Sequence, residues 1–303
     1  MELIETKVHI GENKISIGDL YNNVRLIDKT GIEYVYGTNL STSEFAAEAC
    51  FKIDPISYRD IKLCIVVTQT PEDFLPANGI KIAELIELPK NCLTFDINQG
   101  CSGFVQALCV LDKLLKSYEK ALLITVDKYR SKLNPTDRST NAVFSDGATA
   151  SILRNNHSYK IFYEDHYTDG SKRKLLYQSV NNKENGGFLH MSGAEVWMFT
   201  RLKVVPQIQK AINFCDKNKL QLKGVYMHQA SKVVVEGISQ MLSISKDLIF
   251  ETYSIYGNTV SSSIPFMFER HPMEFDGKNS VYIMAGFGVG LTSTVMIYGR
   301  KND

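Results

Sequence analysis

Residues 93–115 of the chain read LTFDINQGCSGFVQALCVLDKLL, and this stretch determines the fold that we expect. Its first five residues form an alternating apolar run, which predicts a buried strand. Residues 100–103 are small and allow a tight turn. Apolar side chains then recur at spacings of three and four, which predicts a helix. One face of this helix would be formed by Phe104, Leu108, Leu111, Leu115 and Tyr118.

Cys101 therefore lies at a strand-to-helix turn, next to backbone N–H groups that have no partner inside the helix. These donors and the helix dipole favour a thiolate, so we expect the pKa of Cys101 to be lowered. Flanking glycines would let a substrate approach the sulfur, as a nucleophilic cysteine requires. A free cysteine is more often a small buried hydrophobic residue. The turn alone leaves these two interpretations about evenly balanced.

The composition is that of an ordinary globular enzyme, with 303 residues, 44% hydrophobic and 22% charged. A net charge of +1 gives no electrostatic reason to expect nucleic acid or a membrane surface as a partner. The six cysteines follow no metal-binding spacing, so we expect reduced thiols and no metal site. The N-terminus lacks a basic segment followed by an apolar one, and no apolar run approaches ~18 residues. The expected location is the cytoplasm.

Short apolar strands alternate with amphipathic helices along the whole chain, which predicts a layered α/β architecture. We expect two halves, residues 1–154 and 155–303, separated at the start of the most polar stretch. A Ser-x-x-Glu capping box predicts the first clear helix, residues 41–51. The other expected elements are strands 62–68, 121–126, 148–153, 224–228, 280–285 and 291–298, a surface loop 128–141, and helices 77–86, 194–215 with a kink at Pro206, 232–242 capped by Ser231, and 261–270.

Two further polar residues stand at turns in the second half. His228 ends an apolar strand, and Asn258 follows Gly257 in a loop that enters a helix. Taken alone, the histidine is more often a core residue with satisfied hydrogen bonds, and the asparagine a turn former. The glycine-rich run 286–290 could by itself be a bulge.

Taken together, these residues resemble the ketoacyl-acyl-carrier-protein synthase III family of the thiolase superfamily. The matching segments follow family order from about Lys29 to Met296. They are TGI at 30–32, DIN at 96–98, CSGF at 101–104, PTDR at 135–138, FSDGA at 144–148, MxGxEV at 191–196, HQA at 228–230, YGNT at 256–259 and GFGVG at 286–290. The resemblance implies the five-layered αβαβα thiolase fold, with two similar halves that each contain a mixed five-stranded sheet, and it implies a homodimer.

The resemblance also implies a two-stage reaction that needs no cofactor or metal. Cys101 would take an acyl group from a coenzyme A or phosphopantetheine thioester, and a malonyl thioester would then lose carbon dioxide and attack the acyl-cysteine. His228 and Asn258 suit the second stage, because two neutral donors can hold the developing oxyanion without protonating the carbanion. We assign a separate oxyanion hole to the backbone N–H groups of Cys101 and of Gly288 or Val289.

Five further residues match family positions that contact the substrate: Lys29, Leu75, Arg138, Ser231 and Phe287. Leu75 would line the acyl pocket of the partner subunit, and Phe287 would lie beside the cysteine. The chain departs from the family at several of these places. Arg25 stands for a tryptophan that stacks on adenine, Lys29 for an arginine, Ser231 for an asparagine, and Met198 and Val233 for basic residues that dock the carrier protein. These departures favour a carrier-protein thioester over coenzyme A as donor, and a specialised pathway.

Three other functions remain open at this point. An acyltransferase of the same fold would pass the acyl group to an alcohol or amine, with His228 as general base. A non-catalytic subunit would only bind acyl or carrier-protein partners, although it would have no need for all three polar residues. A papain-like hydrolase would leave the other motifs unexplained.

Overall fold

The first half contains a mixed five-stranded sheet, as expected. The structure is a computed structural model that describes residues 1–21, 24–116, 119–179, 185–277 and 279–301. The strand order is β1-β7-β6-β4-β5, in which β4, β5 and β6 run parallel and β1 and β7 add antiparallel strands. The bounds are β1 Glu2–Ile10, β4 Ile61–Val67, β5 Leu93–Ile97, β6 Lys120–Asp127 and β7 Gly147–Arg154. The strands expected at 62–68, 121–126 and 148–153 are confirmed.

The strand that precedes Cys101 lies at the edge of this sheet. β5 pairs only with β4 among the described strands, and Leu93 at its start is 61% exposed. The prediction of a buried strand at 93–97 is therefore wrong in its burial, although the element itself is present. An apolar pattern does not reveal whether a second strand covers the other edge.

The second sheet has four strands within the described residues, in the order β11-β12-β13-β8. Their bounds are β8 Tyr159–Thr168, β11 Gln221–Met227, β12 Ser280–Gly288 and β13 Thr292–Arg300. The expected fifth strand is reduced to an isolated parallel bridge between Val225 and Ile249. A 3₁₀ turn, η6 (Lys246–Leu248), immediately precedes Ile249, so too little extended chain remains there to form a strand. The expectation of five strands in this half is corrected to four.

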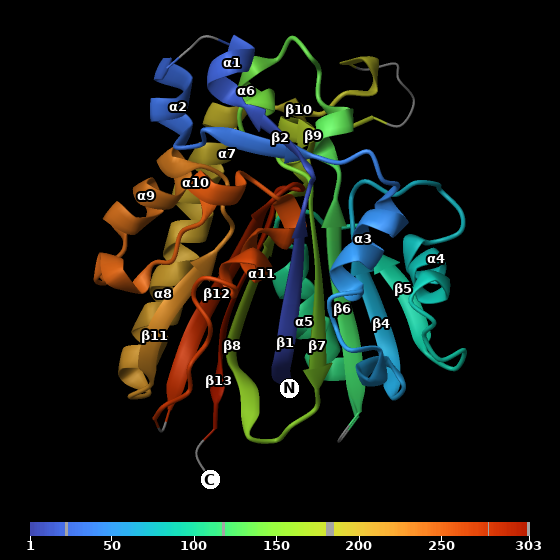
Figure 1. The fold of residues 1–303 in the computed structure, drawn as a ribbon. Coiled ribbons are helices and arrows are strands. Elements are labelled where there is room, and N and C mark those ends of the chain that lie inside the picture. The colour runs from blue at the N-terminus through green and yellow to red at the C-terminus, as the bar shows by residue number, and fades with distance from the viewer. Residues whose placement is uncertain (22–23, 117–118, 180–184, 278, 302–303) are drawn as a thin grey trace.

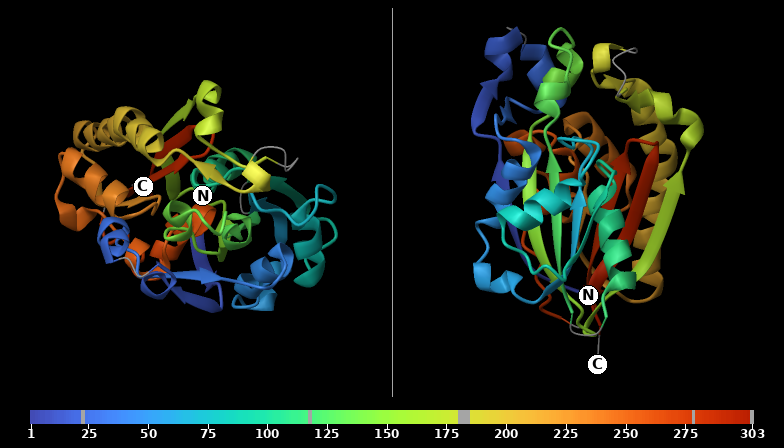
Figure 2. Two further views of the ribbon diagram at one scale, coloured as in Figure 1. Left: turned by 90° about the horizontal axis from the view of Figure 1, so that it is seen from above. Right: turned by 90° about the vertical axis from the view of Figure 1, so that its right-hand side faces the viewer.

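Helices form three layers around the two sheets, which gives the five-layered αβαβα arrangement (Figures 1 and 2). α3 (Thr42–Cys50) and α4 (Asn78–Leu85) cover the outer face of the first sheet, and α8 (Val205–Lys217) and α9 (Lys232–Met241) lie outside the second. α5 (Gly103–Leu114) and α11 (Ser263–Met267) lie between the sheets. This is a thiolase-like fold.

Local sequence signals explain most helix bounds. The capping box at α3 forms as expected, because Ser41 Oγ accepts from Glu44 N–H at 3.3 Å and Glu44 Oε2 accepts from Ser41 N–H at 2.9 Å. The helix expected at 194–215 is α7 (Gly193–Phe199), a π-helical turn η5 (Thr200–Val204) and α8. Pro206 cannot donate a backbone hydrogen bond, and the widened turn lies directly before it. Tyr118, expected on the face of α5, lies outside the described residues.

Other helix expectations need correction. The helix expected at 261–270 is shorter, with a 3₁₀ turn η7 (Val260–Ser262) followed by α11, because Pro265 has no N–H to donate to the Ser261 carbonyl. Ser231 precedes α9, but its side chain makes no capping hydrogen bond. The surface loop expected at 128–141 contains two short helices and buries Tyr129 and Leu133. The remaining elements are β2 Asn13–Ser16, α1 Ile17–Tyr21, α2 Val24–Thr30, β3 Tyr34–Gly37, η1 Pro55–Tyr58, η2 Tyr129–Lys132, α6 Arg138–Asn141, η3 Gly170–Leu175, β9 Leu176–Tyr177, η4 Asn185–Gly187, β10 His190–Met191 and α10 Tyr253–Tyr256.

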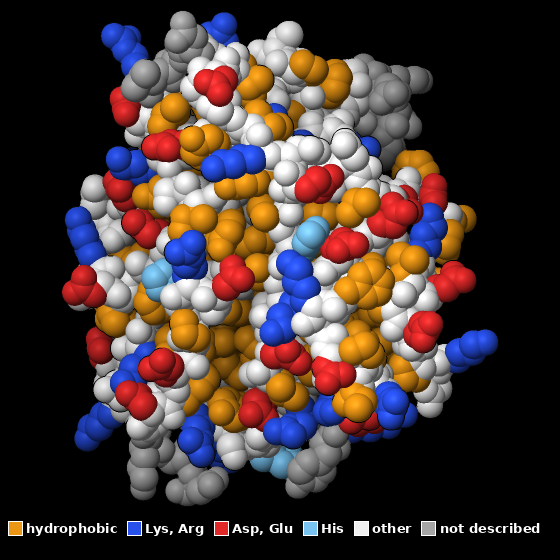
Figure 3. Space-filling model, viewed as in Figure 1, with side chains coloured by type: hydrophobic (Ala, Val, Ile, Leu, Met, Phe, Trp, Pro, Cys, Tyr) orange, Lys and Arg blue, Asp and Glu red, His pale blue; other side chains and the backbone are white. Residues whose placement is uncertain are grey.

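The surface carries both signs of charge without a large area of one sign on the face shown in Figure 3, in keeping with the net charge of +1. All six cysteines lie among the described residues, and all are free. Within the described part of the chain, none of the helices combines the length and apolar character that crossing a bilayer requires.

Candidate active site

Cys101 lies in the turn between β5 and α5 and is 6% exposed. The end of β12, from the second half, lies directly against this turn. A Cβ at position 288 would lie 3.1 Å from Cys101 Sγ, and one at position 286 would lie 2.8 Å from Ser102 Cα. Only glycine gives the backbone this close approach. The structure thus brings Cys101 together with Gly288, one of the two residues at which we expected the second donor of an oxyanion hole.

The pKa of the Cys101 thiol is shifted in the direction opposite to our expectation. Burial raises this pKa well above its usual range, and the neighbouring carboxyl of Asp127 raises it further. The expected thiolate at a helix N-terminus is therefore not the resting state of the free protein. The thiol must lose its proton as it attacks.

His228 follows β11 and is 2% exposed. Its backbone N–H donates to the Ala285 carbonyl at 2.9 Å, and its Nδ1 pairs with Ser263 Oγ at 2.8 Å. The ring meets the Phe287 ring edge to face, with the ring centroids 5.5 Å apart. Burial lowers the pKa of His228 to about 3, although the Val260 carbonyl opposes this shift. The imidazole is therefore neutral at physiological pH, and when Ser263 donates to Nδ1 the proton is on Nε2.

Asn258 lies in a turn that is fixed to the first half. Its backbone N–H donates to the Val143 carbonyl and its own carbonyl accepts from Ser145 N–H, each at 2.9 Å. Its Oδ1 accepts from Val260 N–H at 2.9 Å, so the amide NH₂ group points away from that backbone. Val260 has a φ of 56°, which is a strained conformation for a β-branched residue. A strained backbone persists only where its neighbours fix it, and here the hydrogen bonds to Val143 and Ser145 fix the turn.

The three turns that carry Cys101, His228 and Asn258 converge on shared neighbours. Cys101, Phe287 and Val260 belong to one buried apolar cluster, and Val289 packs against it. Phe287 contacts the His228 ring, and Val260 binds the Asn258 side chain. The turns that carry the three expected catalytic residues thus pack against the same apolar cluster.

The expected substrate contacts fall into two places. Arg138 begins α6, and its guanidinium lies over the Tyr21 ring, 5.8 Å from the centroid. Lys29 is exposed in the last turn of α2, and α2 lies beside α9, the helix that Ser231 precedes. Leu75 is in a different place, on the loop between β4 and α4, where it is 85% exposed.

A cavity of about 960 Å³ connects the expected oxyanion segment with the loop that precedes α4. Val289 and Gly290 line one side, Tyr129 and Leu189 another, and Phe74 borders it from the loop. Leu75 does not line this cavity in its own chain. The space is large enough for an acyl chain, and Val289 and Gly290 join its lining to the glycine-rich segment that contacts Cys101.

One group of described residues could hold a metal ion. Ligand atoms of Cys109, Glu164 and His166 lie within 4.8 Å of one another, on α5 and β8. The Lys113 ammonium already pairs with both carboxylate oxygens of Glu164, at 3.0 and 3.2 Å. This group is two turns along α5 from Cys101 and contributes nothing to the site described above.

Four residues that the sequence analysis did not single out also build the site. Asp127 could have been noticed, because it is an acidic residue directly after an apolar strand. Tyr21 is an aromatic residue close to Arg25, where the family has a tryptophan. Ser263 and Val260 gave no comparable signal, because a hydroxyl in a helix and a β-branched residue in a loop are both common.

The fold and the site define a thiolase-fold acyltransferase, and comparison with known proteins agrees. Residues 95–170 match the model of 3-oxoacyl-[acyl-carrier-protein (ACP)] synthase III, and residues 215–299 match its C-terminal model. The chain is 30% identical to the β-ketoacyl-[acyl-carrier-protein] synthase III of Streptococcus agalactiae serotype III, over 87% of this chain and 86% of that protein. The chain belongs to the 3-oxoacyl-[acyl-carrier-protein] synthase III family.

Solved structures share the fold at lower sequence identity. The 3-oxoacyl-[acyl-carrier-protein] synthase III of Aquifex aeolicus superposes with a TM-score of 0.85 at 24% identity, over 98% of this chain and 99% of that chain. The priming β-ketosynthase of the R1128 polyketide pathway superposes with a TM-score of 0.84 at 20% identity, over 99% and 97%. These likenesses support the fold.

Proposed function

We propose that this protein is a decarboxylating condensing enzyme that joins an acyl group to a malonyl thioester. The observation that supports the proposal is the contact between Cys101 and the 286–288 segment, together with the contact between Phe287 and the neutral His228 ring.

In the first stage, the Cys101 sulfur attacks the carbonyl carbon of an acyl thioester. The thiol proton leaves as the S–C bond forms, and it protonates the departing thiolate of the carrier or coenzyme. The N–H groups of Cys101 and of the 288–289 segment would bind the tetrahedral oxyanion. One such donor is typically worth about 2.7–4 kcal/mol of barrier.

In the second stage, a malonyl thioester loses carbon dioxide and its electrons move onto the thioester carbonyl oxygen. His228 Nε2–H and the Asn258 NH₂ group would hold that oxygen. Both donors are neutral, so they stabilise the enolate without protonating its carbon. The carbanion then attacks the acyl carbon, a C–C bond forms, and the S–C bond to Cys101 breaks. The released Cys101 thiolate takes a proton from water. No cofactor or metal takes part in this proposal.

The donor is proposed to be a carrier-protein thioester, with coenzyme A thioesters as weaker substrates. Arg138 already lies over Tyr21, and position 25 lacks an aromatic side chain, so the adenine-stacking site that the family implies is changed. The exposed Met198 and Val233 make the surface beside α9 more apolar than the family pattern. These features favour a specialised pathway, in the cytoplasm, where all six free cysteines would remain reduced.

A homodimer is proposed on the basis of the edge strand β5 and its surroundings. Large apolar side chains are exposed along β5, α4, α5 and the loop before α4, and they are Phe74, Leu75, Ile80, Leu85, Leu93, Val110 and Leu114. Such a surface with an unpaired strand edge suits a second copy of the chain. We infer that Leu75 of each copy approaches the acyl cavity of the other.

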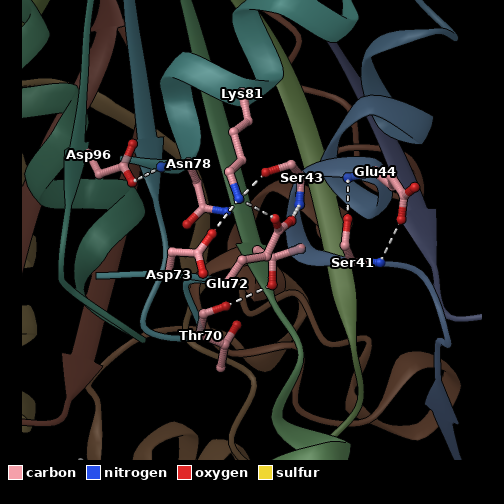
Figure 4. Close-up of polar contacts among 10 residues, drawn as sticks. Ser41, Ser43, Glu44, Thr70, Glu72, Asp73, Asn78, Lys81 and Asp96 are labelled. Carbon is pink, nitrogen blue, oxygen red and sulfur yellow. Dashed lines mark hydrogen bonds and ion pairs between the residues drawn. The ribbon is translucent and has the colours of Figure 1, made fainter. Parts of the chain in front are cut away.

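The loop that carries Phe74 and Leu75 is held in place by a polar network (Figure 4). Lys81 Nζ pairs with Glu72 at 2.9 Å and with Asp73 at 2.5 Å, and Glu72 accepts from Ser43 N–H at 2.5 Å. Burial alone would raise the pKa of Glu72, but the hydrogen bonds from Ser43 and Lys81 hold it down at about 2. Two exposed apolar side chains on an anchored loop support a preformed contact surface.

The proposal is tested with purified protein, an acyl-carrier-protein thioester and a malonyl-carrier-protein thioester. Intact-mass measurement should show the acyl group on the wild type and none on the Cys101→Ala variant. Carbon dioxide and the β-ketoacyl product should appear in equal amounts. Acylated Cys101 without either product, across donors of different chain length, would reject condensation.

A further inference from the structure

Asp127 is a fully buried carboxyl at the end of β6, and it binds segments from both halves of the chain. Its Oδ1 accepts from Gln69 N–H at 2.8 Å, directly after β4 in the first half. Its Oδ2 accepts from Ser261 N–H at 3.2 Å and from Ser261 Oγ at 2.5 Å, in the second half. A buried carboxyl is costly unless its oxygens are bound, so these three hydrogen bonds are part of the local structure.

The Gln69 contact leads to the nucleophile. The Gln69 side-chain oxygen accepts from Tyr129 OH at 3.1 Å and lies so close to Gly100 that a Cβ there would be 2.2 Å away from it. Gly100 directly precedes Cys101. Asp127 therefore fixes the backbone of Gln69, and the Gln69 side chain packs against the turn that carries Cys101.

The Ser261 contact leads to the two neutral donors. Ser261 follows the strained Val260, whose N–H binds Asn258 Oδ1, and Ser263 pairs with His228 Nδ1. Thr125, two residues before Asp127 on the same strand, binds Ser262 Oγ at 2.8 Å. The end of β6 thus binds Ser261 and Ser262. These two residues lie between Val260, which binds the Asn258 side chain, and Ser263, which pairs with His228.

We propose that Asp127 is a positioning residue. It fixes the turn that carries Cys101, in the first half, relative to the turn that carries Asn258, in the second half. This inference rests on the proposed condensation, but the placement of the carboxyl next to Cys101 is tested without any substrate. The groups that face Asp127 are Cys101, Tyr129 and Asp146, and none of them carries a positive charge. An ionised Asp127 therefore disfavours the thiolate at Cys101.

The first experiment measures the rate of Cys101 alkylation by iodoacetamide against pH, in the full-length protein. Burial raises the pKa of Asp127 to about 7, so the carboxyl is ionised in the alkaline range where the thiol titrates. The Asp127→Asn variant should shift the alkylation profile to lower pH by about one unit. The matched control is Asp146→Asn, which removes a buried carboxyl that accepts from the N–H groups of Arg130 and Thr38 in the first half and should shift the profile less.

The second experiment separates the two stages of the reaction. Ser261→Ala leaves the Asp127 side chain in place but removes one of its hydrogen bonds to the turn that carries Asn258. It should lower condensation at least fivefold, while acylation of Cys101 and the alkylation profile stay within twofold of the wild type. Condensation at the wild-type rate in this variant would overturn the proposal.

An unchanged alkylation profile in a folded Asp127→Asn variant would also overturn it. If that variant does not fold, Ser261→Ala decides the question alone. If the wild type forms no condensation product, the proposed function fails, but the alkylation profiles still test whether Asp127 acts on Cys101.

Discussion

Gly288 faces the Cys101 sulfur so closely that a Cβ at position 288 would lie 3.1 Å from Sγ and 2.9 Å from the cysteine Cβ. Replacement of Gly288 by alanine should therefore displace either the thiol or the end of β12. We expect acyl-Cys101 formation to fall at least about 100-fold, as when an oxyanion-hole donor is lost. Intact-mass kinetics with an acyl thioester would measure this.

Gly170→Ala is the matched control, because a Cβ there meets no atom within 4 Å. It should acylate at the wild-type rate. Normal acylation in Gly288→Ala would show that the 288 backbone does not border the reacting carbonyl.

Asn258→Ala distinguishes condensation from simple acyl transfer. In a condensing enzyme the amide holds the enolate oxygen, so its loss should lower condensation by about 10²–10³ while Cys101 still acylates within a few fold. In an acyltransferase His228 would act as base and Asn258 would be nearly dispensable. Product formation and acylation are measured side by side, with Asn218→Ala, directly after α8, as control. Near-normal turnover of the Asn258 variant would favour transfer.

Much of the fold could be predicted because local signals and the fold agree. The capping box at Ser41, the apolar run of β4 and the glycine turn at Cys101 each depend on neighbours in sequence. The exposure of Leu93 could not be predicted, because alternation is the same in an edge strand and an interior strand. The prediction of a fifth strand in the second half was also wrong. A resemblance between the two halves does not specify how much extended chain surrounds Ile249.

The candidate site shows the same limit. Cys101, His228 and Asn258 stand at turns that the sequence reveals. The direction of the thiol pKa shift does not follow from its turn, because the burial of Cys101 is created by Gly286 and Gly288 from the other half. Asp127 is visible as an acidic strand end, but its partners Gln69 and Ser261 become neighbours only after folding.

The dimer proposal predicts that a charge on the edge strand separates the subunits. Leu93→Lys places a cation on an apolar edge, which is a common way for proteins to prevent strand pairing. We expect the apparent dissociation constant of the dimer to rise at least about tenfold, because burying the lysine costs more than burying the leucine. Sedimentation velocity at micromolar concentration measures this, with Leu202→Lys as a control of matched exposure, 62% against 61%. An unchanged dimer in the Leu93 variant, or a monomeric wild type, would contradict the proposed interface.

The buried, neutral state of His228 predicts how stability changes in acid. The folded protein holds the pKa of His228 near 3, whereas 6.5 is the ordinary value that applies to the unfolded chain. Between these values the unfolded chain binds the extra proton, so the contribution of His228 is present above pH 6.5 and is lost as the pH falls. The free energy of unfolding is measured in urea at pH 6.5 and 4.5 for the wild type and for His228→Asn. Between these pH values the wild type should lose on the order of 2 kcal/mol more than the variant. The exposed His157→Asn variant is the control and should follow the wild type. Parallel losses in wild type and His228→Asn would mean that the imidazole can be protonated inside the folded protein, and a charged ring would no longer suit the role of a neutral donor to the enolate.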